Sequence, residues 1–316
     1  MADKYIGIDV GGTFIKAGIV DRDGNIVIDG KIASECDKGG MQLAENAATL
    51  VHDLLDKSGL TKADIVGVGM GFPGFIDSKN GIVVYSNNVR LSDFPVVKIM
   101  QEKLGLNVKI ANDANVAALG EVKFGAGKGY KDMVMVTLGT GVGAGIIIDG
   151  KLYEGNRSAG AEVGHMLLIH GGEQCTCGRK GCFEAYSSAT ALIRDTKRAM
   201  NEHKDSAMWE IGSIDNVTGV TPFDYASKDV YAKQVVDNYI EMLGSALTDL
   251  ANIFRPEAII IGGGVCAQGD NLIVPLRKKM NQELFGAEFG SPEVELRVAE
   301  LGNKAGLLGA AALVTE

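Results

Sequence analysis

A group of potential metal ligands lies near the middle of the chain. Cys175, Cys177 and Cys182 fall within eight residues, and His165 lies ten positions before Cys175. Three thiolates and one imidazole complete a tetrahedral shell, which is typical of structural zinc because catalytic zinc keeps one position open. Glycines at 178 and 181 favour the tight turns that a metal knuckle requires. The spacing therefore predicts a structural zinc site.

Two other interpretations of these cysteines remain open. The side chains are small enough to be ordinary buried residues, or a disulfide joins Cys177 to Cys182. The chain has five cysteines, an odd number, and the stretch MADKYIGIDV has no apolar region before a cleavage site, so we expect no export signal. Both observations disfavour a disulfide.

Two carboxylates flank the cysteines. Glu162 lies three residues before His165, and Glu184 lies two residues after Cys182. Such glutamates are usually solvated surface groups. A metal knuckle would hold both of them in fixed places, however, so their position indicates a site for a polar ligand.

A candidate general base lies between an apolar segment and a helical one. Asn112 and Asp113 follow a strand expected at 108–111 and open a helix expected at 114–123. Asx residues at helix starts are mostly only N-caps. A carboxylate at the carboxyl end of a strand in an α/β domain also faces the ligand-binding edge. Asp113 is therefore the candidate.

A glycine turn near the N-terminus has the composition of a phosphate-binding loop. Residues 9–13 read Asp-Val-Gly-Gly-Thr between strands expected at 5–9 and 15–20. Backbone N–H groups and the Thr13 hydroxyl can face an anion there, and Asp9 can hold a hydrated cation. Alone, this pattern is more often a simple hairpin, and it is neither a P-loop nor a dinucleotide fingerprint.

The same layout occurs a second time. The segment 135–151 again has a hydrophobic strand, a glycine-threonine turn at 139–141, an Ala-Gly pair and an Asp-Gly hairpin. A third glycine turn at 262–264 follows a strand expected at 258–261. A repeated supersecondary unit predicts two similarly folded halves.

Length and composition describe a two-domain globular protein. The chain has 316 residues, 46% of them hydrophobic and 22% charged, and a net charge of −9. That charge argues against nucleic-acid or anionic-membrane partners, which require basic surfaces. The longest apolar run, 133–148, is interrupted by glycines, so we expect a cytoplasmic protein.

These motifs together resemble a known family. Two hairpin phosphate loops with a later Gly-Gly-Gly turn resemble the actin, Hsp70 and sugar-kinase superfamily. The stretch C-x-C-G-x-x-G-C-x-E, preceded by G-A-E-V-G-H, resembles the ROK sugar kinases, and E-A-Y-S-S-A-T is most similar to the bacterial glucokinases among them. The resemblance covers essentially the whole chain.

The resemblance implies an α/β fold of two ribonuclease-H-like domains around a central cleft. We expect residues 1–118 to form the first domain, with a C-terminal helix at 304–316 packing back on it. The second domain, at 119–303, would carry the zinc knuckle. The family also suggests a homodimer or homotetramer.

The resemblance further implies an ATP:hexose phosphotransferase of carbohydrate metabolism and glycolysis, converting glucose to glucose 6-phosphate. Its cofactors would be ATP, Mg²⁺ and structural Zn²⁺, and its base, within A-N-D-A-N-x-A-A-L-G-E, would be Asp113. The implied sugar-binding residues are Asn87, Asn112, Asp113, Glu162, His165 and Glu184. The implied nucleotide-binding residues are Asp9, Gly11, Gly12, Thr13, Lys16, Gly139, Thr140, Gly141, Gly262, Gly263 and Gly264.

Alternative functions remain open at this point. Fructose, mannose, allose or N-acetylmannosamine could replace glucose, because one or two pocket residues can switch the hexose. A ROK-type repressor would need a basic surface and a helix-turn-helix ahead of the first strand. We expect that first strand to begin at about Tyr5. A chaperone-like ATPase would not explain the zinc knuckle.

Overall fold

The computed structural model describes residues 3–315 and divides into two compact units. Unit 1 contains the chain up to Lys131, the segment Gly145–Ala161 and the chain from Ala299. Unit 2 contains Asp132–Ala144 and Glu162–Val298. Unit 1 thus extends beyond residue 118, where we expected the first domain to end.

The segment Gly145–Ala161 belongs to unit 1, and its first residue packs closely against a helix of that unit. A Cβ atom on Gly145 would lie 2.4 Å from the Ala118 Cβ and 2.9 Å from the Ala114 carbonyl oxygen. Only a residue without a side chain permits this approach. Gly145 therefore groups with the helix that carries both alanines.

Two five-stranded sheets have the same arrangement. The first has the order β3 (Ile26–Ala33), β2 (Phe14–Asp21), β1 (Lys4–Val10), β4 (Ile65–Phe72) and β8 (Val108–Asn112). The second has the order β11 (Lys151–Tyr153), β10 (Val142–Ile148), β9 (Met133–Leu138), β12 (Ala258–Gly262) and β13 (Glu295–Val298). In each sheet the last two strands join in parallel. The matching order confirms the predicted repeat.

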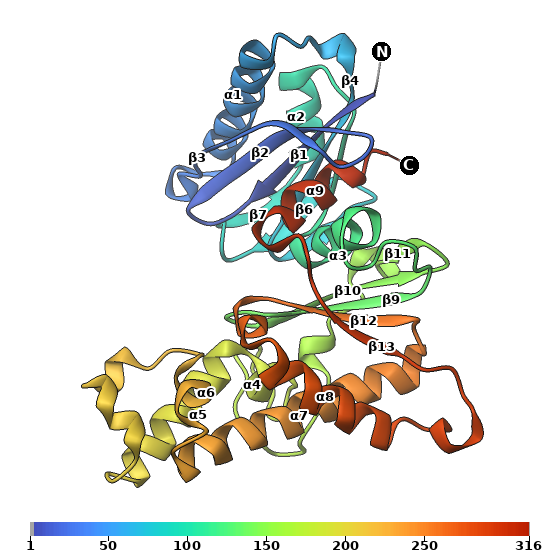
Figure 1. Cartoon of the computed structure of the whole chain (residues 1–316). Helices are drawn as coiled ribbons and strands as arrows, with labels where there is room; N and C mark the ends of the chain where they lie inside the picture. The colour runs from blue at the N-terminus through green and yellow to red at the C-terminus, as the bar shows by residue number, and fades with distance from the viewer. Residues whose placement is uncertain (1–2, 316) are drawn as a thin grey trace. The chain divides into compact units, whose positions relative to one another are not determined.

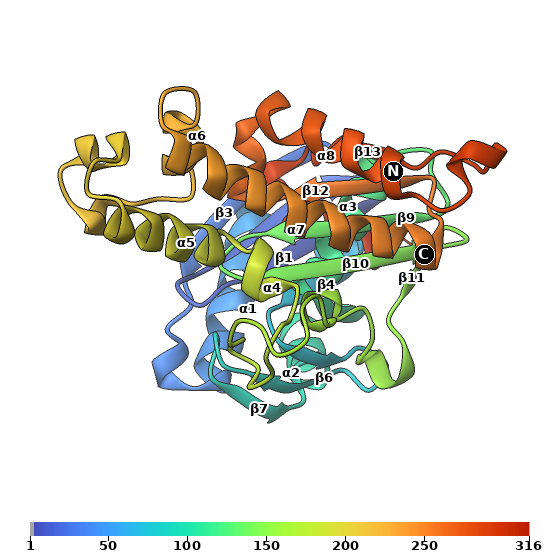
Figure 2. The same cartoon turned by 90° about the horizontal axis from the view of Figure 1, so that it is seen from below.

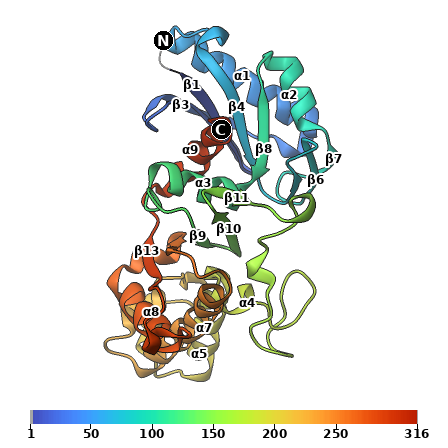
Figure 3. The ribbon, with the colours of Figure 1, turned by 90° about the vertical axis from the view of Figure 1, so that its right-hand side faces the viewer.

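Helices cover both faces of the first sheet (Figures 1 and 3). On one face lie α1 (Gly40–Ser58) and α2 (Val96–Leu104), and on the other lie α3 (Asp113–Phe124) and α9 (Ala305–Ala312). Alternation along β1 explains both contacts: Ile6 and Ile8 join the core under α1, whereas Tyr5 faces α9.

Glycines bring α9 close to the sheet. A Cβ on Gly7 would lie 2.0 Å from the Leu307 carbonyl oxygen, and one on Gly69 would lie 1.7 Å from that of Ala310. The helix therefore rests on bare backbone at these two positions. A fully buried carboxylate, Glu121 on α3, accepts hydrogen bonds from the N–H groups of Ala126 and Leu301 and ties α3 to the segment before α9.

A long helix organises unit 2. It is α7 (Val230–Phe254), which packs against α4 (Glu184–Ser187), α5 (Ala189–Glu202), α6 (Thr221–Tyr225) and α8 (Asp270–Glu283). Figure 2 shows α5 and α7 side by side. Apolar residues recur every 3.6 residues over 230–254, a pattern that by itself predicts a helix with the bounds of α7, and the residue before Pro256 is biased away from the helical conformation.

The remaining elements are short. A three-stranded antiparallel sheet is formed by β5 (Phe75–Asp77), β6 (Ile82–Ser86) and β7 (Leu91–Phe94). The 3₁₀ helices are Cys36–Lys38, Lys62–Asp64, Asn156–Ser158, Val163–His165, Ala207–Ile211, Ile214–Asn216, Gly264–Gln268, Ala287–Phe289 and Gly302–Lys304. Within residues 3–315, every helix is too short or too polar to cross a membrane.

Candidate functional site

The predicted metal ligands lie together in unit 2. The ligand atoms of His165, Cys175, Cys177 and Cys182 all lie within 4.8 Å of one another. The Sγ atoms of Cys177 and Cys182 are 3.7 Å apart, and Cys175 Sγ is 3.8 Å from His165 Nδ1. Gly178 and Gly181 have φ angles of 92° and 86°, as the tight turns require.

These distances fit a metal better than a disulfide. Sulfur ligands about 2.3 Å from zinc in a tetrahedron lie about 3.8 Å apart. A disulfide would bring two sulfurs to about 2.05 Å, whereas all five cysteines are free. Burial, together with hydrogen bonds that the Cys182 thiol donates to Cys177 and Cys175, raises the pKa of Cys182 to about 12. A cation binding here must therefore displace a proton.

Glu184 connects this cluster to the second glycine turn. One carboxylate oxygen accepts the N–H of Val142 at 3.0 Å, and the other accepts the Thr176 hydroxyl at 3.1 Å and the Cys175 thiol at 3.6 Å. A Cβ on Gly141 would lie 2.3 Å from this carboxylate. The sequence pattern predicts Glu184 as a ligand residue but gives no sign of its hydrogen bond to Val142.

The two glycine turns of unit 2 lie side by side. The Gly139 N–H donates to the Gly141 carbonyl at 3.0 Å, which closes the turn after β9. A Cβ on Gly263 would lie 2.2 Å from the Leu138 carbonyl, so the turn after β12 packs on the end of β9. The parallel pairing of β12 with β9 brings both turns to the same edge of the sheet.

In unit 1, the turn after β1 is held by its carbonyl groups. The Ser34 hydroxyl donates to the Gly11 carbonyl at 2.5 Å, and the Cys36 thiol donates to the Gly12 carbonyl at 3.4 Å. The N–H groups of Gly12 and Thr13 make no hydrogen bond within the described part of the chain. These two N–H groups can thus serve an anion, and sequence reasoning missed Ser34 and Cys36.

Gly12 is required for a contact rather than for its φ angle. Neither Gly11 nor Gly12 has a positive φ. A Cβ on Gly12 would lie 2.9 Å from the Asn88 carbonyl oxygen. The turn therefore packs against the Asn87-Asn88 segment that follows β6, which places one predicted sugar ligand beside the phosphate turn.

Asp9 lies at the start of the same turn. Its carboxylate is 3.6 Å from Lys16 Nζ, and its side chain is 25% exposed. A Cβ on Gly306 would lie 2.9 Å from the Asp9 Cγ atom, so the start of α9 packs against it. One partly exposed carboxylate fits a Mg²⁺ ion only when phosphate oxygens and water complete the octahedron.

The candidate base opens α3. The side chain of Asn112 is the N-cap, because its Oδ1 accepts the N–H groups of Ala114 at 2.9 Å and Asn115 at 3.4 Å. Its Nδ2 donates to the Gly74 carbonyl at 3.0 Å. Asp113 follows as the first helical residue, and its Oδ1 also accepts the Ala114 N–H at 2.9 Å. The capping role thus belongs to Asn112.

The chain is similar to known proteins over almost all of its length. The chain matches the ROK family over residues 5–316. It is 38% identical to a glucokinase of Halalkalibacterium halodurans, over 100% of this chain and 96% of the relative. It is 30% identical to a xylose repressor of Caldicellulosiruptor bescii, over 98% of this chain and 78% of the repressor.

A solved structure shows the same fold. A ROK family glucokinase from Streptomyces griseus, crystallised with glucose and AMPPNP, is 36% identical over 98% of each chain, with a TM-score of 0.80. The fold class predicted from the motifs, α/β with two ribonuclease-H-like domains, is thereby confirmed. The chain belongs to the ROK family.

Proposed function

We propose that this protein is an ATP-dependent glucokinase that transfers a phosphoryl group to a hydroxyl of glucose. Full-length similarity to glucokinases and to a structure holding glucose and AMPPNP supports the substrates. The observation that carries the proposal is Asp113, a carboxylate at the carboxyl end of β8 that is not needed as the cap of α3.

Asp113 would act as the general base. The start of a helix favours the ionised carboxylate, which accepts the proton of the sugar hydroxyl as that oxygen attacks the γ-phosphate in line. In a loose transition state the base contributes modestly and positioning contributes most. Asn112, bonded to the Gly74 carbonyl, keeps the start of the helix in place.

Each unit would contribute to nucleotide binding through its glycine turns. In unit 1, the N–H groups of Gly12 and Thr13 would bind phosphate oxygens, with Gly11 shaping the turn. In unit 2, the turns at 139–141 and 262–264 would do the same. Asp9 would hold hydrated Mg²⁺, which would neutralise phosphate charge, and Lys16 would be its neighbour.

The sugar would be recognised by amide, carboxylate and imidazole side chains, some from unit 1 and some from unit 2. Asn87 and Asn112 are the proposed ligands in unit 1, beside Asp113. Glu162, His165 and Glu184 are the proposed ligands in unit 2. His165 can serve both metal and sugar, because Nδ1 faces Cys175 while Nε2 makes no hydrogen bond in the described residues. Unpaired carboxylates are costly, so these residues would discriminate between sugars.

A structural Zn²⁺ ion held by His165, Cys175, Cys177 and Cys182 would complete the site. The ligand separations support this assignment. The ion would supply no chemistry of its own and would fix the loop that carries Glu184 and His165.

The test is Asp113→Asn assayed against a panel of hexoses by ADP release. Wild-type protein should turn over glucose fastest, with fructose, mannose, allose and N-acetylmannosamine as the alternative substrates. Asp113→Asn keeps the size of the side chain and the Asn112 cap, so turnover should fall by about 10²-fold or more while glucose still binds. Asp205→Asn, an exposed acid, is the control. A loss within about tenfold would remove Asp113 as the base.

A second candidate is a sugar-sensing, repressor-like binding protein. The similarity to a xylose repressor favours it. Such a protein would bind sugar in calorimetry and release no ADP above the ATP-only background. A net charge of −9 supports the absence of a nucleic-acid partner.

We also propose that the protein is a homodimer or homotetramer. It would act in glycolysis, in the cytoplasm, where ATP and free hexose are available, and it would have no membrane partner. Light scattering after size-exclusion chromatography gives the mass directly. A monomer at micromolar concentration would contradict the assembly.

A further inference from the structure

A pocket in unit 2 is lined by residues to which no role in sugar, nucleotide or metal binding has been assigned above. It is formed between α5 and α7, has a volume of about 430 Å³ and is lined by aromatic rings, among them Tyr186, Tyr231, Tyr239 and His203. The rings of His203 and Tyr231 are stacked at 3.7 Å. Its volume falls within the range of small-molecule sites, about 300–1,000 Å³.

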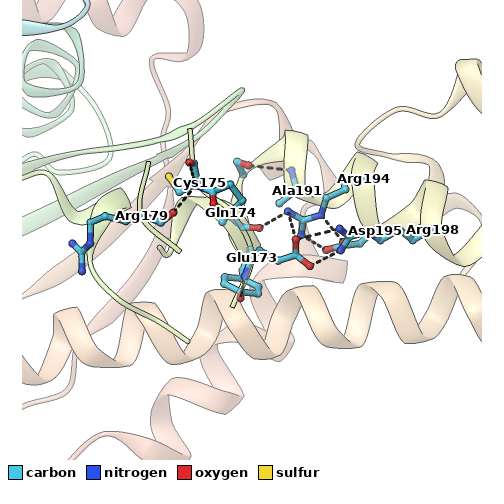
Figure 4. Close-up of polar contacts among 11 residues, drawn as sticks. Glu173, Gln174, Cys175, Arg179, Ala191, Arg194, Asp195 and Arg198 are labelled. Carbon is cyan, nitrogen blue, oxygen red and sulfur yellow. Dashed lines mark hydrogen bonds and ion pairs between the residues drawn. The ribbon is translucent and has the colours of Figure 1, made fainter. Parts of the chain in front are cut away.

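The charges at the pocket favour a cation. Its one lining cation, Arg198, is committed to Glu173, with hydrogen bonds of 2.5 and 3.1 Å (Figure 4). The lining acid Asp195 is likewise paired, with Arg194 at 2.8 Å. Glu202 makes no hydrogen bond or ion pair with any described residue. Glu202 interacts with Arg198 only at longer range. Since Arg198 and Arg194 are already paired with Glu173 and Asp195, Glu202 leaves an excess of negative charge at the pocket, and aromatic faces also attract cations.

Side chains that line or adjoin the pocket form hydrogen bonds with the backbone of the short helix α4. Tyr239 donates its hydroxyl to the Ser187 carbonyl at 2.8 Å, and Tyr186 belongs to α4 itself. Arg194 donates to the Ala185 carbonyl at 2.8 Å. The same helix begins with Glu184, whose carboxylate accepts the Val142 N–H.

The wall also contacts the segment leading into the cysteine knuckle. The Tyr186 hydroxyl accepts the Glu173 N–H at 2.6 Å, and Arg198 binds the Glu173 carboxylate. Glu173 lies two residues before Cys175. Two pocket side chains thus hold a segment that continues directly into the proposed zinc ligands.

We propose that this pocket binds a small organic cation with an aromatic body, of the aromatic amine class, and that binding stabilises α4 and the segment 173–182. The aromatic rings contact the body of the ligand and Glu202 pairs with its ammonium group. The inference goes beyond the proposed kinase function and does not depend on it.

Titration calorimetry with tryptamine tests the binding site. Indole-3-propionate is the matched control ligand, because it has the same ring and chain length but carries a carboxylate. Wild-type protein should bind tryptamine at least tenfold more tightly than indole-3-propionate. Glu202→Gln should weaken tryptamine binding about fivefold, the scale of one exposed charge pair. Glu288→Gln, at another exposed glutamate of unit 2, should not weaken it. Equal affinities for the two indoles, or equal losses in the two variants, would overturn the site.

Hydrogen exchange tests the connection to the knuckle. Saturating tryptamine should slow amide exchange in 173–187 and in 230–242. Arg198→Gln removes the ion pair with Glu173, so the slowing should persist in 230–242 and be reduced at least threefold in 173–182. Unchanged exchange at 173–187 in the wild type would overturn the connection. Neither measurement uses phosphoryl transfer, so failure of the proposed kinase activity would be seen separately.

Discussion

The Glu184 carboxylate accepts the backbone N–H of Val142, 42 residues away in the chain. Its second oxygen accepts the Thr176 hydroxyl beside Cys175. One side chain thus joins the cysteine knuckle to the glycine turn at 139–141. A residue proposed as a sugar ligand is therefore also a support for a proposed phosphate turn.

This double role predicts that Glu184→Ala affects both substrates. The Val142 N–H loses a charged acceptor, a change of about 1.5–3 kcal/mol, so the turn at 139–141 becomes less ordered. In steady-state assays we expect KM for ATP to rise about tenfold, together with a larger rise for glucose.

Glu162→Ala is the matched control for this experiment. Glu162 is proposed as a sugar ligand, and its side chain makes no hydrogen bond or ion pair with any residue that the structure describes. It should raise KM for glucose and leave KM for ATP within about twofold. A Glu184→Ala protein with wild-type KM for ATP would show that the turn holds without this hydrogen bond.

The second prediction concerns Gly12. Gly12→Val would place a branched side chain against the Asn88 carbonyl, which already lies 2.9 Å from an ideal Cβ position. The turn and the Asn87-Asn88 segment must then separate, so affinity for an ATP analogue should fall at least tenfold while the fold persists. Titration calorimetry and a thermal melt measure the two effects. Gly219→Val should change neither, because an added Cβ there meets only the Ala189 Cβ, at an ordinary contact distance of 3.9 Å, and φ is not positive. If Gly12→Val binds the nucleotide with wild-type affinity, the turn after β1 is not the phosphate site.

Local patterns were sufficient where neighbouring residues determine the structure. The periodicity of 230–254 predicted both ends of α7, because a long amphipathic repeat bounded by Asp229 and Pro256 leaves little freedom. The cysteines and His165 were predicted as one cluster because most of the cluster is a single short loop. The repeated hairpin predicted two similarly folded halves, and the two five-stranded sheets do have the same strand order.

Contacts between distant segments had no comparable signal. Nothing near Glu184 in the sequence indicates a bond to Val142, and nothing near Gly12 indicates the Asn88 carbonyl. The capping role of Asn112 and the support of the first turn by Ser34 likewise depend on how elements pack. Residue types predicted which chemistry is present, and packing decided which side chain supports which turn.

The third prediction concerns the metal. Purified protein should contain about one zinc per chain, since four protein ligands leave no position for water. Cys177→Ala should lose the metal and lower the melting temperature, because metal binding is coupled to local folding. KM for glucose should rise more than KM for ATP, because three proposed sugar ligands lie in or beside the knuckle. Cys266→Ala, a buried cysteine outside the cluster, should keep the zinc. A zinc-free variant with wild-type KM for glucose would show that the metal stabilises the loop but does not position the proposed sugar ligands.

The last prediction concerns the start of α7 and its dependence on pH. The Asp229 carboxylate accepts the Ser206 hydroxyl at 2.6 Å and the N–H groups of Tyr231 and Ala232 at 2.7 and 3.1 Å. Burial by itself would raise the pKa of Asp229, but these hydrogen bonds outweigh it, and the pKa lies below its ordinary value. The folded state thus holds the proton more weakly than the unfolded state.

The sign of the effect follows from this difference. Asp229 stabilises the fold above its unfolded pKa of about 4, and the contribution is lost as pH falls through the lower folded pKa. Asp229→Ala should cost about 2 kcal/mol in urea unfolding at pH 7, and the gap to wild type should narrow progressively below pH 4. Asp237→Ala, which removes an exposed pair with Lys233 on the same helix, should cost under about 0.5 kcal/mol at either pH. A gap for Asp229→Ala that stays constant from pH 7 to pH 3 would mean that helix capping by the ionised carboxylate is not what the residue contributes.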